Sequence, residues 1–301
     1  MKIPLPPSAA TEARNPASRN IDSLSSLQIA QLMNQEDAKV AAAVAQETPT
    51  IAKAIDQISS RMQRGGRLIY QGAGTSGRLG VLDASECPPT FSVPPGLVIG
   101  IIAGGRAALT SAIEGAEDRW EEGARDLEPL AITELDTVMG IATSGRTPYV
   151  LGGIQFARKR GCLTLGLACN HGSALSDAVD LMITTVVGPE VVTGSTRLKA
   201  GTATKMVLNM LTTGTMIRLG KTYGNLMVDV TATNEKLRDR SVRIVAELTS
   251  LSCEDAATRL DFCGGEVKTA VVSQLLSVSP ENARERLAAC GGHLRAALGS
   301  Q

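Results

Sequence analysis

The chain has very few aromatic residues: three Phe, three Tyr and one Trp among 301 residues, or 2%. Proteins that bind single-stranded nucleic acid commonly stack bases on aromatic side chains, so this composition disfavours that class. An excess of one charge is also missing, because 30 Lys and Arg residues balance 30 Asp and Glu residues. No global field therefore favours a nucleic acid or a membrane surface as a partner.

Metal ligands and disulfide patterns are scarce as well. The chain holds two histidines, and its six cysteines are far apart with no C-x-x-C pair. This pattern favours reduced, buried thiols over a zinc site or a disulfide framework, and we expect no metal ion or other cofactor. The longest apolar run, residues 96–104, is too short to span a bilayer, and residues 1–20 show no apolar signal-peptide core. We therefore expect a soluble cytoplasmic protein.

What the chain does contain is a regular alternation of short apolar runs and helical stretches. Each run is aliphatic or β-branched and nearly continuous, as expected of parallel strands covered on both faces. The predicted strands are residues 68–71, 97–102, 138–142, 163–167 and 181–187. The predicted crossover helices are residues 78–85, 107–126, 148–160 and 174–178. Together they predict an α/β fold with a five-stranded parallel, doubly wound, flavodoxin-like sheet that binds ligands at the carboxyl ends of its strands.

Helical segments flank this block on both sides. Prolines keep residues 1–20 extended. Apolar spacing predicts helices over residues 24–33, 36–46, 48–63, 200–219, 227–247, 254–260, 267–276 and 280–289. We expect three parts: an N-terminal arm with helices (1–47), a ligand-binding sheet domain (48–247) and a small all-helical C-terminal subdomain (248–301).

Three loops that follow predicted strands share hydroxyl, glycine and arginine residues. They read Thr75-Ser76-Gly77-Arg78, Thr143-Ser144-Gly145-Arg146 and Thr193-Gly194-Ser195-Thr196-Arg197. The carboxyl ends of parallel strands share one edge of a sheet, so we expect the loops to converge there. Hydroxyls, backbone N–H groups and the helix N-terminus after the first loop suit a phosphate group. Arg78 and Arg146 could equally be surface or ion-paired arginines.

The first loop also contains a G-x-G-x-x-G pattern, at Gly72, Gly74 and Gly77. A dinucleotide-binding fold requires an acidic residue at the end of its second strand. Here that strand runs into Ala103-Gly104-Gly105-Arg106 without a carboxylate, and no glycine-lysine-Ser/Thr follows the loop as in a Walker motif. The pattern therefore favours a smaller phosphate over a dinucleotide.

Two groups of acidic residues stand near these loops in the sequence. Glu86 precedes Pro88, where we expect the first crossover helix to end and to place the carboxylate at an irregular junction near the loops. The second group should share one face of the predicted helix 107–126, where most members could simply face solvent. Its members are Glu114, Glu117, Asp118 and Glu121.

These motifs resemble those of N-acetylmuramic acid 6-phosphate etherases. The similar segments are GAGTSGRLG at 72–80, LDASECPP at 82–89, EGAED at 114–118, TGSTRLKAGT at 193–202, GNLMVDV at 224–230 and TEARNP at 11–16. The resemblance covers nearly the whole chain and is highly specific through residue 240. It implies a sugar isomerase (SIS) fold, a homodimer, and cleavage of the lactyl ether of a bacterial cell-wall sugar phosphate.

The resemblance also implies that Glu86 and Glu117 are the catalytic carboxylates. Glu86 would protonate the departing lactate oxygen, and Glu117 would act as the base at C2 or as a partner in water addition. Glu114 competes for the second role. No metal is required, since the sugar carbonyl supplies the activation. We expect the substrate and its phosphate to be bound by Thr75, Ser76, Gly77, Ser144, Gly145, Arg146, Thr147, Ser195 and Lys199.

Two other functions remain open for the same residues. An aldose–ketose sugar-phosphate isomerase could use this fold and a carboxylate base, but it would release no lactate. A non-catalytic regulatory protein, such as the glucokinase regulatory protein, would bind a sugar phosphate without turnover. The presence of both Glu86 and Glu117 in etherase-like surroundings favours the etherase. In each case the partner is a small sugar phosphate, not a nucleic acid or a membrane.

Overall fold

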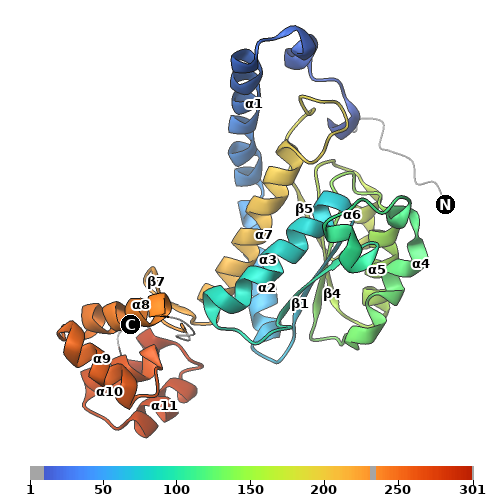
Figure 1. The fold of residues 1–301 in the computed structure, drawn as a ribbon. Helices are drawn as coiled ribbons and strands as arrows, with labels where there is room; N and C mark the ends of the chain where they lie inside the picture. The colour runs from blue at the N-terminus through green and yellow to red at the C-terminus, as the bar shows by residue number, and fades with distance from the viewer. Residues whose placement is uncertain (1–9, 231–234, 300–301) are drawn as a thin grey trace. The chain divides into compact units, whose positions relative to one another are not determined.

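The computed structural model describes residues 10–230 and 235–299, and the chain forms two compact units (Figure 1). The first unit comprises the residues up to Glu86 together with Pro95–Thr212. The second comprises Cys87–Pro94 and the residues from Thr213 onward. The second unit thus begins well before the boundary expected near residue 248.

The first unit is built on a five-stranded sheet in the order β2-β1-β3-β4-β5, with every neighbouring pair parallel. This confirms the predicted doubly wound α/β fold. The strands are β1 (Leu68–Gly72), β2 (Val98–Ile102), β3 (Thr137–Ile141), β4 (Leu163–Ala168) and β5 (Leu181–Thr184). All five lie within a residue or two of their predicted positions, except that β5 ends three residues early.

Helices cover both faces of this sheet (Figure 1). The α-helices are α1 (Ser26–Gln46), α2 (Thr48–Met62), α3 (Gly74–Phe91), α4 (Trp120–Arg125), α5 (Pro148–Lys159), α6 (Ala174–Ala178) and α7 (Lys199–Arg218). Short 3-10 helices are η1 (Ala10–Glu12), η2 (Pro16–Ser18), η3 (Ile21–Ser23), η4 (Gly105–Leu109), η5 (Ala116–Asp118) and η6 (Glu128–Leu130).

Three helix predictions were wrong in instructive ways. The segment 107–126 is not one helix, because Gly115 adopts a left-handed conformation and Arg119 is extended, which leaves only η4, η5 and α4. Residues 24–33 and 36–46 lie largely in the single helix α1, which a capping box at Ser25 begins and no Gly or Pro interrupts. Helix α3 does not end at Pro88 but continues through Pro89 to Phe91.

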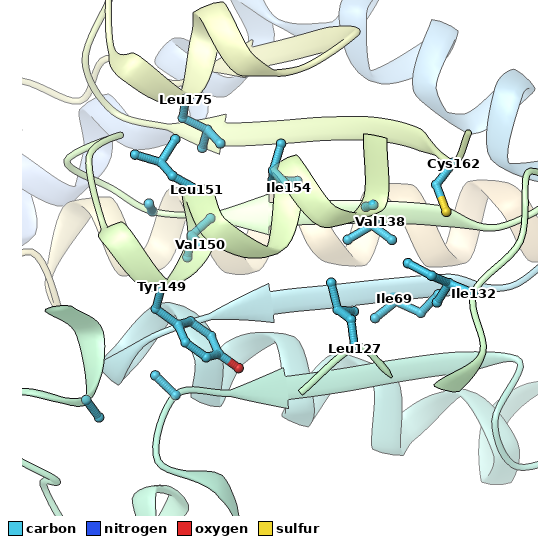
Figure 2. Close-up of a cluster of buried hydrophobic side chains, with 14 residues drawn as sticks. Ile69, Leu127, Ile132, Val138, Tyr149, Val150, Leu151, Ile154, Cys162 and Leu175 are labelled. Carbon is cyan, nitrogen blue, oxygen red and sulfur yellow. The ribbon is translucent and has the colours of Figure 1, made fainter. Parts of the chain in front are cut away.

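One buried cluster of the first unit lies between the sheet and helices α4 and α5. Figure 2 shows Ile69 of β1 and Val138 of β3 facing Leu127 and Ile154 across this layer. Strands β1 and β3 are buried along their whole length, as expected of central strands covered on both faces. Burial of this aliphatic surface stabilises the edge from which the site-forming loops extend.

The second unit is helical, with one two-stranded ribbon. Its elements are β6 (Thr222–Tyr223), β7 (Leu226–Met227), α8 (Glu235–Thr249), α9 (Cys253–Phe262), α10 (Val267–Leu276), α11 (Pro280–Ala289) and α12 (Leu294–Ala297). Helix α8 was expected to begin at residue 227, but the described part begins at Glu235, and residues 231–234 lie outside the described ranges. Val245 of α8 shares a buried cluster with Leu260 and Val271, which explains why α8 belongs to this unit.

The second unit contains an internal repeat. Ser252 and Ser279 each cap a helix, α9 or α11, by accepting a backbone N–H three residues ahead. Each helix ends in a Cys-Gly-Gly segment, Cys263-Gly264-Gly265 or Cys290-Gly291-Gly292, whose glycines have positive φ. Helix α10 or α12 follows at once. Two copies of a helix–Gly-Gly–helix element therefore build most of this unit.

Among the described helices, none is both long enough and apolar enough to cross a membrane.

Candidate active site

A cavity of about 780 Å³ lies at the carboxyl ends of β1 and β3. In the order β2-β1-β3-β4-β5, the chain reverses its direction of winding between β1 and β3. Doubly wound sheets bind their ligands in the crevice at this reversal, and the volume suits a small-molecule site.

The structure brings all three hydroxyl-glycine loops to this cavity. Of the predicted binding residues, those that line it are Thr75, Ser76, Ser144, Arg146 and Thr147. The third loop contributes Gly194 and Thr196. Helix α3 begins at Gly74, beside Thr75, so its N-terminal backbone N–H groups and positive dipole end lie at the same wall. This wall can accept a phosphate group.

The glycine pattern of the first loop has a packing origin. A Cβ on Gly72 would lie 2.7 Å from the backbone nitrogen of Gly77, and a Cβ on Gly77 would lie 2.7 Å from the carbonyl oxygen of Gly72. Only glycines let the end of β1 approach the first turn of α3 this closely. Gly77 therefore shapes the cavity without lining it.

Gly145 and Ser195 also belong to the loops without lining the cavity. Gly145 has φ +69°, and a Cβ there would lie 2.3 Å from the Ser173 Cβ. Its carbonyl oxygen accepts the backbone N–H of Leu175 at 2.9 Å. The second loop is thus fixed against the start of α6, and its shape depends on a glycine at this position.

Glu117 and Asp118 of η5 also line this cavity. Glu117 also lines an adjoining cavity of about 210 Å³, to which Glu114 belongs. Arg78 holds the preceding segment in place, since its guanidinium donates to the carbonyl oxygens of Leu109 at 3.1 Å and Ser111 at 3.2 Å. Arg78 therefore helps to position the acidic segment and does not line the large cavity.

Glu86 lies elsewhere on the first unit. It is exposed near the far end of α3, and a rise of about 1.5 Å per residue puts its Cα roughly 18 Å along the helix from Gly74. It lines a separate cavity of about 260 Å³ with Asp83, Lys205 and Asn209. The expectation that Glu86 stands at a junction near the loops was wrong, because α3 continues past Pro88.

Asp83, one turn before Glu86, is the buried centre of a hydrogen-bond network. Its carboxylate accepts from Tyr70 Oη at 3.1 Å, Asn209 Nδ2 at 2.7 Å and Thr212 Oγ1 at 3.2 Å. Burial raises the pKa of the Asp83 carboxyl, and these three hydrogen bonds oppose the rise. The network ties β1 and α7 to the part of α3 that presents Glu86.

Lys199 is not at the cavity. It is 2% exposed, and its ammonium lies 2.6 Å from the Glu36 Oε2 atom of α1. The Glu190 carboxylate accepts the backbone N–H groups of Lys199 and Ala200, which caps α7. Because Lys199 is buried and paired, the structure does not make it available to a substrate phosphate.

Sequence reasoning missed some residues that line the cavity. The most informative is Glu12, which comes from the N-terminal arm and is 182 positions away from Gly194 of the third loop. The signal for it was the TEARNP segment at 11–16, which resembled the etherases but carried no assigned role. The described residues contain no group of three or more His, Cys, Asp and Glu side chains placed to hold a metal ion.

Comparison with known domains first defines the class of protein. A family model described as the SIS domain matches residues 122–214, and one described as the glucokinase regulatory protein N-terminal SIS domain matches residues 50–158. The structure of a phosphoheptose isomerase from Francisella tularensis superposes with a TM-score of 0.53 at 19% identity, covering 64% of this chain and 100% of that one. The fold is therefore that of the SIS proteins.

Closer relatives then define the family. N-acetylmuramic acid 6-phosphate etherase of Rhodopirellula baltica is 62% identical over 261 residues, which cover 87% of this chain and 86% of the relative. The etherase of Streptomyces coelicolor is 61% identical over 87% of this chain and 84% of its own. The chain belongs to the N-acetylmuramic acid 6-phosphate etherase family.

Proposed function

We propose that the protein cleaves N-acetylmuramic acid 6-phosphate into N-acetylglucosamine 6-phosphate and D-lactate, as a cytoplasmic enzyme of amino-sugar catabolism. Lactate leaves from C3, which is β to the C1 aldehyde of the ring-opened sugar. Loss of the C2 proton, acidified by that carbonyl, expels lactate and forms a C2–C3 double bond. Water then adds, with its oxygen bonding to C3 and a proton returning to C2.

The identity of 62% to an etherase over 87% of the chain carries this proposal, and the cavity at β1 and β3 supports it. The loops that line the cavity supply hydroxyls, backbone N–H groups and Arg146 for the phosphate. Thr75, Ser76, Ser144, Arg146 and Thr147 would contact the substrate, while Gly77, Gly145 and Ser195 would shape the loops.

Glu117 lines the cavity and is the proposed base at C2 or partner in water addition. Glu86 is the proposed acid that protonates the lactate oxygen. Such acid–base assistance typically contributes roughly 10²–10⁴-fold. Both side chains are exposed carboxylates, so each is accessible to a bound sugar.

A lactate assay on the purified protein tests the proposal. We expect D-lactate from N-acetylmuramic acid 6-phosphate, and water labelled with heavy oxygen should place the label at C3 of the sugar. A sugar-phosphate isomerase or a regulatory protein would release no lactate. Label in the lactate would contradict elimination followed by hydration.

Replacing the acidic residues tests the assignment of roles. Glu117→Ala should lower lactate release by roughly 10²-fold or more, because it removes a proton-transferring group. Glu114→Ala is the matched control, since Glu114 lines only the smaller adjoining cavity. If Glu114→Ala alone abolished lactate release, the assignment of Glu117 would be wrong.

We also propose that the active unit is a homodimer in which each site combines Glu117 of one chain with Glu86 of the other. The support is geometric: within one chain, these residues line different cavities, and Glu86 is about 18 Å along α3 from the phosphate wall. A two-fold axis would pair the two cavities reciprocally.

Mixed dimers test this arrangement. Glu86→Gln and Glu117→Gln chains should each be inactive alone. In mixed dimers, one of the two sites would hold both native carboxylates, so random mixing after co-expression should restore about one quarter of wild-type activity. Mixed dimers that stay inactive would show that each site uses both carboxylates of a single chain.

A further inference from the structure

The N-terminal arm is held by two buried groups of hydrogen bonds, here called clamps, on either side of Glu12. On one side, the Thr11 backbone N–H donates to Asn170 Oδ1 at 3.3 Å, and Asn170 Nδ2 donates back to Thr11 Oγ1 at 3.0 Å. Asn170 Nδ2 also donates to the carbonyl oxygen of Thr143, which lines the cavity. This clamp therefore joins the arm directly to the second loop.

The second clamp lies three residues beyond Glu12. Asn15 Nδ2 donates to Glu36 Oε2 at 2.9 Å and to the carbonyl oxygen of Pro189 at 3.1 Å. Thr11, Asn15 and Asn170 are each less than 10% exposed, so these hydrogen bonds are protected from water. These buried hydrogen bonds fix the backbone of the arm on both sides of Glu12, and so they fix the position of Glu12 itself.

Between the two clamps, Glu12 presents an exposed carboxylate that lines the 780 Å³ cavity. Its Oε2 atom would lie 3.6 Å from a Cβ built on Gly194, so the carboxylate lies against the third loop. The acidic residues that line the cavity are Glu12, Glu117 and Asp118, and the basic residue that lines it is Arg146. The anionic group of a ligand would therefore be bound by Arg146 and the N-terminus of α3 rather than by the carboxylates.

We propose that Glu12 is a substrate-binding residue that accepts hydrogen bonds from hydroxyl groups of the sugar-phosphate ligand. A carboxylate is acceptor-only when ionised, and sugar hydroxyls are its natural donors. Thr11, Asn15 and Asn170 act as positioning residues that hold the arm so that Glu12 faces the cavity. The inference rests on the proposed function for its ligand and adds a specificity-determining residue outside the sheet loops.

Binding measurements separate sugar recognition from phosphate recognition. Titration calorimetry would compare N-acetylglucosamine 6-phosphate with inorganic phosphate on the wild-type chain and on Glu12→Gln. The Glu12→Gln change should weaken binding of the sugar phosphate roughly ten- to hundred-fold, as expected for losing a hydrogen bond to a charged group. Inorganic phosphate should bind equally well or more tightly, because a nearby negative charge has been removed.

Kinetics and a control variant complete the test. Glu12→Gln should raise KM for N-acetylmuramic acid 6-phosphate, while Asp22→Asn, an exposed carboxylate on the same arm that does not line the cavity, should change neither KM nor kcat. Thr11→Val, which removes one hydrogen bond of the first clamp, should raise KM in the same direction as Glu12→Gln.

Four outcomes would overturn the inference. Equal weakening of both ligands would mean that Glu12 only maintains the shape of the cavity, and unchanged sugar-phosphate binding would mean that it makes no sugar contact. A wild-type chain that neither binds the sugar phosphate nor releases lactate would overturn the proposed function and this inference with it. Lactate release by the wild type with unchanged Glu12→Gln kinetics would sink only the inference.

Discussion

Glu36 and Lys199 show how a buried pair changes the meaning of a charged residue. Burial by itself would raise the pKa of the Glu36 carboxyl, but hydrogen bonds from Lys199, Lys39 and Asn15 outweigh it and lower the pKa to about 2. Lys199, which begins α7 after the third hydroxyl-glycine loop, is therefore a structural partner of α1. Removing Glu36 would leave the buried Lys199 ammonium without its carboxylate, which commonly costs about 3–5 kcal/mol.

The lowered pKa of Glu36 predicts a pH dependence of stability. The folded-state pKa of about 2 lies below the ordinary value of 4.5, so the unfolded state binds more protons between these values. The ionised Glu36 carboxylate contributes fully to the free energy of unfolding above pH 4.5. This contribution, on the order of 3 kcal/mol, is lost as the pH falls toward 2. Denaturant unfolding measured across this window should show the loss.

A matched pair of variants checks that prediction. Glu36→Gln should flatten the pH dependence between 4.5 and 2, whereas Asp37→Asn, the exposed neighbour on the same helix, should leave it nearly intact. An unchanged slope in Glu36→Gln would mean that other carboxylates determine the acid response.

At the scale of elements, close backbone approaches decide where helices can pack. Helix α4 lies against α5 so tightly that a Cβ on Gly123 would be 1.9 Å from the carbonyl oxygen of Tyr149. By contrast, a Cβ on Gly201 of α7 would have its nearest neighbours at 3.7 Å, an ordinary contact distance. Both glycines lie in helices, but only the position of Gly201 has room for a side chain.

Alanine substitutions at these positions should therefore have opposite effects. Gly123→Ala forces α4 and α5 apart and should lower the free energy of unfolding by about 1–3 kcal/mol. Gly201→Ala adds a methyl group without a clash and should raise it by roughly 0.5–1 kcal/mol, because alanine loses less backbone entropy in a helix. Urea denaturation of both variants measures the difference. A well-tolerated Gly123→Ala would contradict the close packing.

Helix α3 shows the limit of local signals at this scale. Proline disfavours the helical conformation in the residue before it, which predicted an end before Pro88. Instead the helix continues to Phe91, with Cys87 and Phe91 both buried in its last turns. Tertiary burial of these side chains offsets the hydrogen bonds that Pro88 and Pro89 cannot donate.

Across the whole molecule, the six cysteines differ in how far their side chains are exposed to solvent. All six are reduced thiols rather than disulfides, of which Cys253 is exposed, Cys290 is partly buried and the other four are buried. Burial raises the pKa of Cys162 to about 11 and that of Cys169 to about 12. These two thiols are therefore poorly reactive in the folded chain, since the thiolate is the nucleophile.

A thiol titration of the native protein should then show one fast-reacting group. We expect Cys253 to account for the fast phase, so that Cys253→Ser removes it, while the four buried thiols react only on unfolding. If a fast phase of equal size survived in Cys253→Ser, one of the other thiols would be accessible. Cys290→Ser identifies any slower second phase.

The features that depend on local patterns could be predicted from the sequence. Apolar runs located all five strands, the glycine turn after β1 and the hydroxyl loops marked the ligand edge, and the pairs of glycines separated the last helices. These features follow from the side-chain period, the turn residues and the conformational freedom of glycine. The convergence of the three loops also followed, because parallel strands end at a common edge.

Which distant residues lie in contact could be learned only from the folded chain. Lys199 pairs with Glu36, 163 positions away, and therefore does not line the proposed phosphate site. Glu86 is carried along α3 to a cavity of its own, while Glu12 is brought from the arm into the cavity of Glu117. Such contacts form because the surface buried when the whole chain packs outweighs the conformational entropy lost on folding. A local sequence pattern does not contain that balance.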